Sequence, residues 1–498
     1  MNILLVYPLH PTTFWSFKHA LRFVSKKASY PPLGLLTVAS MLPAEWNVRL
    51  VDMNVQHLRD DDLQWAECVF ISAMSIQTTS VREIILRCKE FKKTIVAGGP
   101  LFTSDPESFN DVDYLVLDEA EVTLPLFLND FQQNKARRIY RADHWAEIGS
   151  SPVPRWDLIT KKQYASMNLQ YSRGCPYDCE FCNITVLYGR KPRTKSSAQV
   201  IAELESLYKF GWRGSVFFVD DNFIGNKVRL KKEILPAIIH WMEEHKHPFK
   251  LSTEASVNLA DDDELLSMMV RAGFDAVFVG IETPNEESLR ECEKNHNRNR
   301  DLAASVKKLQ ASGLIVQGGF ILGFDSDPES IFTRMVEFIQ ETRIVTAMVG
   351  LLNAPLGTRL YSRLKEEGRI LRSMTGDNTD FSMNFIPAMA EKVLADGYQK
   401  VLKRLYTPKH YYRRVKNFLK EYQPPFYPRE LSMKRKFSVT LTDISAFMRS
   451  VWRLGLIGKE RFHYWRLLTW TLVHRPRLFP MAVTFSIYGF HFRKIIEM

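Results

Sequence analysis

With 498 residues the chain is longer than a single hydrophobic core usually supports, so two to three domains are expected. Hydrophobic residues at 45% and charged residues at 25% are ordinary for a soluble globular protein, and no apolar run reaches the roughly eighteen residues that a membrane-spanning helix needs. Six cysteines are too few for a disulfide scaffold, and the N-terminus lacks the basic region and cleavage site of a secretory signal, so a cytoplasmic protein is expected.

Residues 1–145 alternate short apolar runs with helical stretches, which predicts an α/β domain with a doubly wound, Rossmann-like open sheet. The helical stretches include 34–42 and 80–91. The apolar runs are continuous, as strands buried on both faces of a parallel sheet should be, and they cover 2–7, 48–51, 68–72, 94–97 and 114–117. A ligand of such a sheet lies beyond the C-terminal ends of its strands.

Small and polar residues follow several of these strands. Asp52 ends the second, Ser72 the third, and the pair Gly98-Gly99 the fourth. The two glycines would let the backbone approach a ligand phosphate closely, and a plain turn is the alternative.

A proline-bearing connector at 150–156 precedes a second α/β part, expected at 155–365. Amphipathic segments, for example 199–210, 262–272 and 299–312, separate its apolar runs. The runs are 168–172, 215–221, 250–256, 276–283, 316–325 and 346–353. Six β/α units in series predict an open (β/α)6 barrel, whose chemistry lies on the loops after the strands.

Three cysteines, Cys175, Cys179 and Cys182, follow the first strand of the expected barrel with the spacing C-x3-C-x2-C. A fully ligated [4Fe-4S] cluster takes four cysteines, so three thiolates leave one iron open, as a catalytic metal keeps a free position. A structural zinc site usually needs a second ligand pair at a fixed offset, and no His or Cys follows Cys182 within fifty residues. The pattern therefore predicts an iron–sulfur cluster with one open iron.

The last part, 370–498, loses the β/α rhythm and is expected to be mostly helical, basic and aromatic. Residues 401–498 hold 20 Lys and Arg against 5 Asp and Glu. A basic surface of this kind is solvated, binds nucleic acid, or docks on an anionic membrane. No nucleic-acid motif is present, so no nucleic-acid partner is expected. For membrane contact, an apolar face is expected in 465–488, formed by Leu467, Leu468, Trp470, Leu472, Leu478 and Phe479.

The triplet, with Phe181 directly before its last cysteine and at the head of six β/α units, resembles the radical S-adenosylmethionine superfamily. In that family the methionine end of S-adenosylmethionine chelates the open iron. An electron from the cluster then releases a 5′-deoxyadenosyl radical, which abstracts hydrogen from an unactivated carbon. The N-terminal domain is similar to a cobalamin-binding domain. The whole chain thus resembles class B radical methylases such as the hopanoid C-2 methylase, and the resemblance implies a [4Fe-4S] cluster, S-adenosylmethionine and cobalamin.

The resemblance implies S-adenosylmethionine contacts where the barrel strands end. Asp220, Asp221 and Asn222 follow the second strand and are acceptors that suit the ammonium group, with a helix N-cap as the alternative for Asn222. Glu254 closes the third strand and resembles a residue that contacts the ribose or the ammonium.

The fourth and fifth barrel strands carry the remaining expected contacts. Gly280 and Glu282 end the fourth strand, and a barrel-rim ion pair is the alternative for Glu282. Gly318 and Gly319 lie on the strand that borders adenine in the family, and a strand bulge is the alternative for them.

The N-terminal domain departs from the family at one informative position. Classical cobalamin domains carry Asp-x-His-x-x-Gly, whose His coordinates cobalt from below. Here the matching run is Asp52-Met-Asn-Val-Gln-His57, so Asn54 stands in the His position and cobalt would lack a lower His ligand. His57 is either a displaced ligand or a surface residue.

Three more residues of this domain acquire roles from the resemblance. Ser72 begins a Ser-Ala-Met that loosely resembles the Ser-x-Leu touching the nucleotide tail of cobalamin. Ser75 and Gln77 would lie near the lower face of cobalt. Gly98 and Gly99 complete the expected cobalamin contacts.

The leading hypothesis is a methyltransferase that acts on an unactivated carbon through the 5′-deoxyadenosyl radical and methylcobalamin. A radical oxidation, cyclisation or rearrangement in which cobalamin donates no methyl is the alternative, and a non-catalytic iron–sulfur sensor or binding module is the second. The expected partners are a small-molecule, lipid or peptide substrate and an external electron donor of the flavodoxin or ferredoxin type. No catalytic residue beyond the cofactor ligands can be named.

Overall fold

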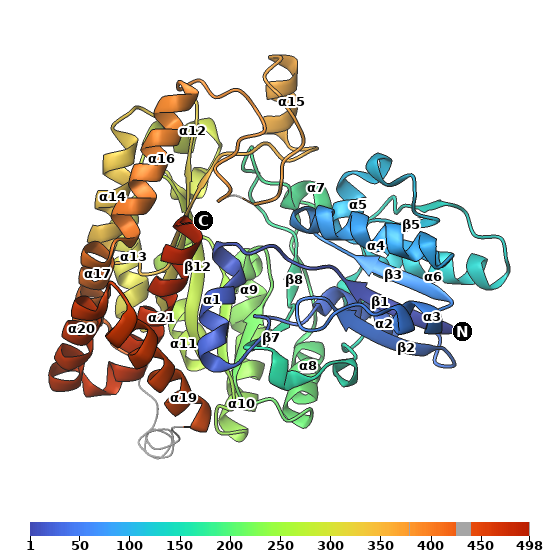
Figure 1. Cartoon of the computed structure of the whole chain (residues 1–498), viewed down its shortest axis with the longest axis horizontal. Coiled ribbons are helices and arrows are strands. Elements are labelled where there is room, and N and C mark those ends of the chain that lie inside the picture. Colours follow the sequence, from blue (N-terminus) through green and yellow to red (C-terminus); the bar gives the residue numbers. More distant parts are fainter. Residues whose placement is uncertain (378, 425–439, 498) are drawn as a thin grey trace.

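A computed structural model describes residues 1–377, 379–424 and 440–497 (Figure 1). The N-terminal part contains the predicted doubly wound sheet, with six parallel strands in the order β2-β1-β3-β4-β5-β6. The strands are β1 (Asn2–Tyr7), β2 (Asn47–Asp52), β3 (Cys68–Ser72), β4 (Thr94–Gly98), β5 (Tyr114–Val116) and β6 (Ile139–Tyr140). The chain order reverses between β1 and β3, and a ligand crevice is expected at such a switch point.

Helices cover both faces of this sheet because alternate residues of each strand point to opposite sides. Ile3 and Leu5 of β1 share a core with α2 (Leu33–Met41) and α6 (Ala120–Gln132). Leu4 and Val6 instead pack with α3 (Asp60–Trp65), α4 (Thr78–Glu90) and α5 (Pro100–Ser104).

The second part is the predicted open barrel, six parallel strands in the order β14-β13-β12-β11-β10-β7. The order follows the chain, as successive right-handed β/α units require. The strands are β7 (Ser166–Leu169), β10 (Ser215–Phe218), β11 (Lys250–Glu254), β12 (Phe274–Glu282), β13 (Ile315–Leu322) and β14 (Ala347–Leu351). The helices between them are α8 (Ser197–Lys209), α10 (Leu235–Glu244), α11 (Asp263–Arg271), α13 (Leu302–Ala311) and α14 (Ile331–Thr342).

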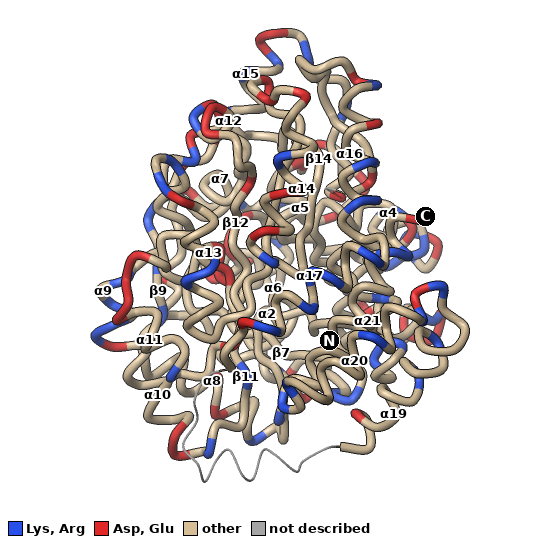
Figure 2. Tube along the Cα trace, turned by 90° about the vertical axis from the view of Figure 1, so that its left-hand side faces the viewer, with Lys and Arg blue, Asp and Glu red and all other residues tan. Residues whose placement is uncertain are grey.

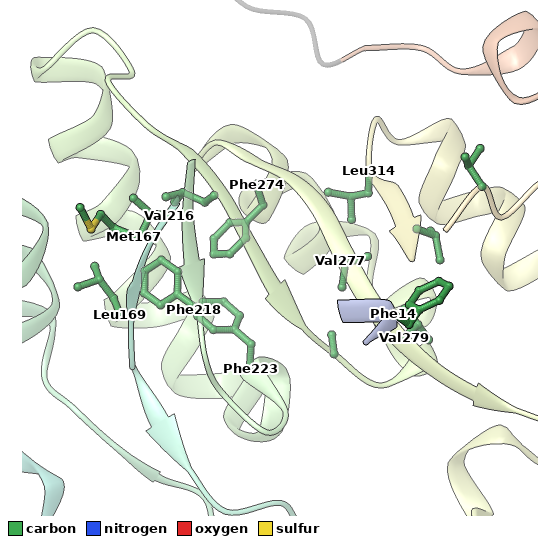
Figure 3. Close-up of a cluster of buried hydrophobic side chains, with 14 of the residues drawn as sticks. Phe14, Met167, Leu169, Val216, Phe218, Phe223, Phe274, Val277, Val279 and Leu314 are labelled. Atoms are coloured by element: carbon green, nitrogen blue, oxygen red, sulfur yellow. The ribbon is translucent and has the colours of Figure 1, made fainter. Parts of the chain in front are cut away.

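Apolar side chains from several barrel strands form a buried cluster (Figure 3). Phe218 of β10, Phe223 just beyond that strand, and Phe274 of β12 have ring centroids 5.0–5.7 Å apart. Aromatic rings at this spacing bury a large apolar area. The loops at the strand ends therefore start from a rigid base.

The last part is helical, as predicted. Its elements are α15 (Arg359–Glu366), α16 (Glu391–Tyr406), α17 (Pro408–Glu421), α19 (Leu441–Ser450), the π-helical η12 (Val451–Ile457), α20 (Arg461–His474), the short 3-10 turn η13 (Pro476–Leu478) and α21 (Phe479–Ile496).

The basic, aromatic character of this part is only partly at the surface (Figure 2). Arg414 is fully buried, and its guanidinium lies over the rings of Tyr406 and Tyr411, 5.5 and 5.3 Å from their centroids. The apolar face expected in 465–488 is wrong for Leu467, Leu468 and Leu478, which belong to the core, whereas Leu472 is 58% exposed. None of the described helices combines the length and apolarity that crossing a membrane takes.

The final helix, α21, packs against the N-terminal segment that contains Phe14. Phe492 of α21 stacks on Phe14 with ring centroids 4.2 Å apart, and the His491 ring nitrogen Nε2 lies 2.9 Å from the Phe14 carbonyl oxygen. One continuous core therefore runs from the N-terminal sheet through the barrel into the C-terminal helices.

Candidate functional site

The cysteine triplet lies on the first loop at the C-terminal end of the barrel. A short antiparallel pair, β8 (Ser172–Arg173) with β9 (Arg193–Thr194), and the helix α7 (Ile184–Tyr188) frame this loop. Cys179 is buried, and Cys175 and Cys182 are partly exposed. The Cys182 amide donates a 3.0 Å hydrogen bond to the Cys179 carbonyl, which closes the turn between those two residues.

The three thiols influence one another electrostatically. Burial, together with the charges of Cys179 and Cys175, raises the pKa of Cys182 to about 12, whereas the Lys294 ammonium lowers the pKa of all three thiols. Thiolates are the metal-binding form, so a group that binds here must supply positive charge. A cluster meets that demand with a separate iron for each thiolate. In the described part of the chain, no three His, Cys, Asp or Glu side chains converge on a single metal ion.

Asp220 and Asp221, at the end of β10, hold the cysteine loop by its backbone. Asp220 is buried and accepts hydrogen bonds from the amide of Tyr171 at 3.2 Å and from the amide and hydroxyl of Ser172. Asp221 accepts one from the Gly174 amide at 3.0 Å, directly before Cys175. Burial raises the pKa of these carboxyls to about 7 and about 6. Asp221 also lines the cavity described below, whereas Asp220 does not.

Asn222 connects the loop to the next strand. Its Nδ2 lies 3.9 Å from the Cys175 sulfur, and its side-chain oxygen accepts from the Ser256 amide at 3.2 Å. The helix that follows begins at Phe223, but no backbone amide is capped by the Asn222 side chain. Asn222 therefore orients Cys175, and Ser256, which sequence reasoning missed, holds Asn222.

Glu254 ends β11 with a carboxylate that faces the cavity. That carboxylate has no hydrogen-bond or ion-pair partner among the residues that the structure describes. Burial raises its pKa to about 8, and repulsion from Asp221 and Asp220 adds to the rise. An unpartnered acid in this position fits a cationic ligand, since a positive charge would replace the missing hydration.

Glu282 forms the barrel-rim ion pair that was the alternative for it. Its carboxylate lies 2.6 Å from the Lys294 Nζ, and both side chains are nearly buried. A Cβ on Gly280 would come within 2.4 Å of the Glu282 carboxylate and 2.9 Å of the Lys294 ammonium, so this glycine makes room for the pair. Lys294 is a second residue that sequence reasoning missed, because it lies twelve positions beyond the strand end, outside any motif.

Gly318 and Gly319 of β13 are packed against aromatic rings. A Cβ on either would lie 2.6 Å from a ring carbon, of Phe320 for Gly318 and of Phe278 for Gly319. Neither glycine lines the cavity, so the structure gives them a packing role, and contact with adenine stays a prediction.

A cavity of about 2920 Å³ lies between the two sheets. It is bounded by the strand ends of the N-terminal domain, by the barrel and by the helices α19 and α21. Among the residues expected to bind cofactors, those that line it are Asp221, Glu254, Asn54, Ser72, Ser75, Gly98 and Gly99. Its size and its position at the switch point suit a large nucleotide-bearing cofactor.

Some of the predicted cobalamin residues line the cavity, and two others lie behind its lining. Gly99 has φ 89°, and a Cβ there would lie 2.6 Å from the Ser72 hydroxyl, so the turn requires glycine and leaves its backbone facing the cavity. Asp52 and Gln77 lie outside the lining: Asp52 accepts a 2.9 Å hydrogen bond from the Tyr164 hydroxyl, and Gln77 donates to the Pro8 carbonyl at 2.6 Å. Both support the strand ends.

The position of the usual cobalt ligand holds Asn54, and its side chain is fully engaged. It donates to Asp52 at 2.8 Å and accepts from the His10 amide at 2.8 Å. His57 is exposed, as the surface interpretation has it. His10 lines the cavity, and burial lowers its pKa to about 4, so it is a neutral imidazole there. Sequence reasoning missed His10, although it follows the first strand as the other site residues follow theirs.

Two arginine and two glutamate side chains, all little exposed, join the N-terminal domain to the cysteine loop. Arg173, two residues before Cys175, donates to Glu119 at 3.0 Å and to Glu121 at 2.7 Å. Arg193 of β9 donates to Glu119 at 2.7 Å. The glutamates lie at the start of α6, so the network ties the two halves of the cavity together.

Three family models match the chain in the same order as its structural parts. Residues 22–128 match the B12 binding domain, residues 169–339 the radical SAM superfamily, and residues 358–498 a domain of unknown function, DUF4070.

Two curated relatives match nearly the full length. The chain is 43% identical to the uncharacterized methyltransferase sll1242 of Synechocystis, over 100% of the chain and 92% of the relative. It is 31% identical to the hopanoid C-2 methylase of Rhodopseudomonas palustris, over 93% of the chain and 88% of the relative.

Solved structures share the fold at low sequence identity. OxsB, a cobalamin-dependent S-adenosylmethionine radical enzyme, superposes with a TM-score of 0.63 at 14% identity, over 100% of this chain and 80% of that one. TsrM, the radical S-adenosylmethionine methyltransferase of Kitasatospora setae, superposes with a TM-score of 0.61 at 14% identity, over 91% and 99%.

Proposed function

This chain belongs to the cobalamin-binding radical S-adenosylmethionine enzyme family, and we propose that it methylates an unactivated carbon of its substrate. The chain is an enzyme with a [4Fe-4S] cluster, S-adenosylmethionine and cobalamin as cofactors. When bound, these cofactors supply hydrogen-atom abstraction and a methyl group. The observation that carries the proposal is the single cavity that the cofactor domain and the barrel share.

The chain's own residues would hold and shield these cofactors. We assign Cys175, Cys179 and Cys182 as cluster ligands, with Asn222 orienting Cys175. The Lys294 ammonium lowers the pKa of Cys179 and so favours its thiolate, whereas the paired Glu282 carboxylate opposes that effect. Glu254 and Asp221 would face the cationic end of S-adenosylmethionine.

The cobalamin would lie against the strand ends of the N-terminal domain. Ser72, Ser75, Gly98 and Gly99 line that side of the cavity, and Asn54 offers no free lone pair on a nitrogen to cobalt. We therefore propose that Asn54 would not ligate the cobalt of a bound cobalamin, and that the cofactor would supply a methyl group for transfer to a carbon.

A lipid is the substrate class that we propose. The relative named hopanoid C-2 methylase acts, by its name, on a hopanoid, and the chain matches 88% of its length. An external electron donor of the flavodoxin or ferredoxin type and a cytoplasmic location with peripheral membrane contact complete the proposal. The support for membrane contact is the basic composition of residues 401–498.

Product analysis separates the proposed reaction from its alternatives. Reconstituted protein with reductant and substrate should form 5′-deoxyadenosine and S-adenosylhomocysteine together. 5′-Deoxyadenosine alone would favour an oxidation, cyclisation or rearrangement, and neither product would favour an iron–sulfur sensor. Replacing Cys175, Cys179 or Cys182 by Ala should remove the cluster absorbance and both products, and full turnover in any one variant would contradict the ligand assignment.

The mode of cobalamin binding has its own spectroscopic test. The Co(II) form should show no axial nitrogen splitting in its electron paramagnetic resonance spectrum. If splitting appears and disappears in His10→Ala, then His10 is the lower ligand and the expectation that cobalt lacks a lower His ligand is wrong.

A further inference from the structure

Helices α19 and α20 and the η12 segment between them expose a set of large apolar side chains on their outer side. The exposed fractions reach 86% for Phe462, 75% for Val473 and 63% for Trp452. We call this set the C-terminal apolar face, and its members are Leu441, Ile444, Met448, Trp452, Leu456, Ile457, Phe462, Trp465, Leu472 and Val473. From Leu441 to Leu456 they recur every three or four residues, and the spacings of three and seven from Phe462 to Leu472 likewise place those residues on one side of α20.

The same helices already have a buried side. Ala446, Leu454, Tyr464 and Leu467 are at most 7% exposed and anchor the helices to the rest of the fold. The outward side of an anchored helix is normally polar, and an exposed apolar patch of this extent marks a surface that binds a partner or a membrane.

The charged residues around the face favour an anionic membrane. Five exposed cations, Arg453, Lys459, Arg461, Arg466 and Arg477, border it. Of the two acids in 441–477, Asp443 is exposed, whereas Glu460 is buried against Arg493 at 2.7 Å. Aromatic and aliphatic side chains interleaved with Lys and Arg are the pattern of helices that lie in the headgroup region of a bilayer.

The face also borders the cofactor cavity. The cavity lining reaches Ile444 and Phe447 of α19 and Phe479 at the start of α21, and Ile444 belongs both to the lining and to the exposed face. Figure 1 shows α19 beside α21 at the lower edge of the barrel. A molecule dissolved in a bilayer under this face would therefore lie next to the part of the cavity that Ile444 and Phe447 line, together with Thr440, Thr442 and Asp443.

We propose that the C-terminal apolar face docks on an anionic phospholipid bilayer and that the substrate, a membrane-dissolved lipid, enters the cavity beside α19. The substrate half of this inference rests on the proposed function, whereas the docking half does not. Of the face expected from the sequence, only Leu472 belongs to this set, and Leu467, Leu468 and Leu478 lie in the core.

Vesicle flotation tests the docking. The full-length holoenzyme should float with vesicles of equal parts phosphatidylglycerol and phosphatidylcholine, and binding to phosphatidylcholine alone should be about tenfold weaker, because several Lys and Arg contribute near a charged surface. The double variant Trp452→Ser/Phe462→Ser should lose binding to the mixed vesicles by about tenfold or more. Leu86→Ser/Val228→Ser, with both side chains 63% exposed elsewhere, is the matched control and should bind like the parent.

Two outcomes would overturn the docking. One is flotation that the Trp452→Ser/Phe462→Ser variant retains in full. The other is a dimer in solution that this variant abolishes while vesicles bind neither protein, which would make the face a contact between copies of the chain.

Entry into the cavity is tested by cross-linking. A diazirine-bearing fatty acid in the mixed vesicles should label peptides that contain Phe447 or Phe479, and labelling confined to α20 would overturn the entry route. Formation of 5′-deoxyadenosine without vesicles should be equal in the double variant and its parent. If the double variant loses vesicle binding but keeps this activity, the substitutions have affected only the docking surface. If the parent itself forms no 5′-deoxyadenosine, the proposed function is wrong.

Discussion

At the scale of single residues, the site depends on carboxylates that do different work although they lie on adjacent strand ends. Asp220 is occupied by backbone amides of the cysteine loop, whereas Glu254 faces the cavity without a partner. Both are acids near a strand end, since Asp220 lies two residues beyond β10 and Glu254 is the last residue of β11. A carboxylate with backbone donors nearby supports the loop, whereas one without such donors is available to bind a cation.

Glu254 should make the stability of the ligand-free protein depend on pH. Its pKa in the folded chain is raised to about 8 from an ordinary value of 4.5, so the folded state holds a proton that the unfolded state has lost. The free energy of unfolding should therefore fall as the pH rises from about 5 to about 8. Glu254→Gln should flatten this part of the curve of thermal midpoint against pH.

A ligand experiment completes this prediction. A bound cation favours the ionised carboxylate, so S-adenosylmethionine should bind the parent more tightly at about pH 8 than at about pH 6, and the Gln variant should bind about tenfold more weakly. An unchanged affinity in the variant would remove Glu254 from the binding site.

At the scale of elements, the contact between α6 and the β8–β9 pair is made by ions and not by apolar packing. Arg193 and Glu119 are 11% and 2% exposed at the side chain, and Arg193 also donates to the Ala146 carbonyl at 2.6 Å. Removing one partner of a buried pair leaves an uncompensated charge, which costs far more than the pair contributes.

Arg193→Met should therefore lower the free energy of unfolding by about 3 kcal/mol, measured by urea denaturation of the reconstituted enzyme. Arg87→Met is the control, because the Arg87–Asp60 pair is 33% and 66% exposed and should contribute less than about 1 kcal/mol. Equal effects in the two variants would show that the network adds no more than a surface ion pair.

At the scale of the whole molecule, the C-terminal helices complete the core of the other two parts. Phe492 is fully buried and stacks on Phe14, and Arg449 donates to the Ser25 hydroxyl at 2.6 Å. The N-terminal segment around Phe14 and the helices α19 and α21 thus share one packing unit, which also bounds the cavity.

Phe492→Ala should cost about 3–5 kcal/mol of unfolding free energy through the cavity it leaves. Hydrogen exchange should quicken in β1 as well as in α21, because both border the same core. Phe462→Ala, at an 86% exposed position, should change stability by less than about 0.5 kcal/mol. Faster exchange confined to α21 would show that the C-terminal helices unfold on their own.

Strand positions were largely predictable because a strand that is buried on both faces of a parallel sheet is a continuous apolar run in the sequence. The six barrel strands and the five predicted N-terminal strands were found, and the two-residue strands β6, β8 and β9 were missed. The cysteine ligands could be assigned because their spacing is local. The domain limits 1–145, 155–365 and 370–498 remain predictions. Both six-stranded sheets lie within the first two ranges, but α15 (Arg359–Glu366) crosses the limit at 365.

The amino-acid sequence alone determined the two α/β parts, the cysteine triplet and the replacement of the usual cobalt ligand by Asn54, since each depends on neighbours along the chain. Tertiary structure alone decided the rest. Lys294, His10 and the Glu119–Arg173 network reach the site from distant positions, and Leu467 turned inward where an exposed face was expected. Burial and charge pairing are set by what packs around a side chain, and a single stretch of sequence does not contain that information.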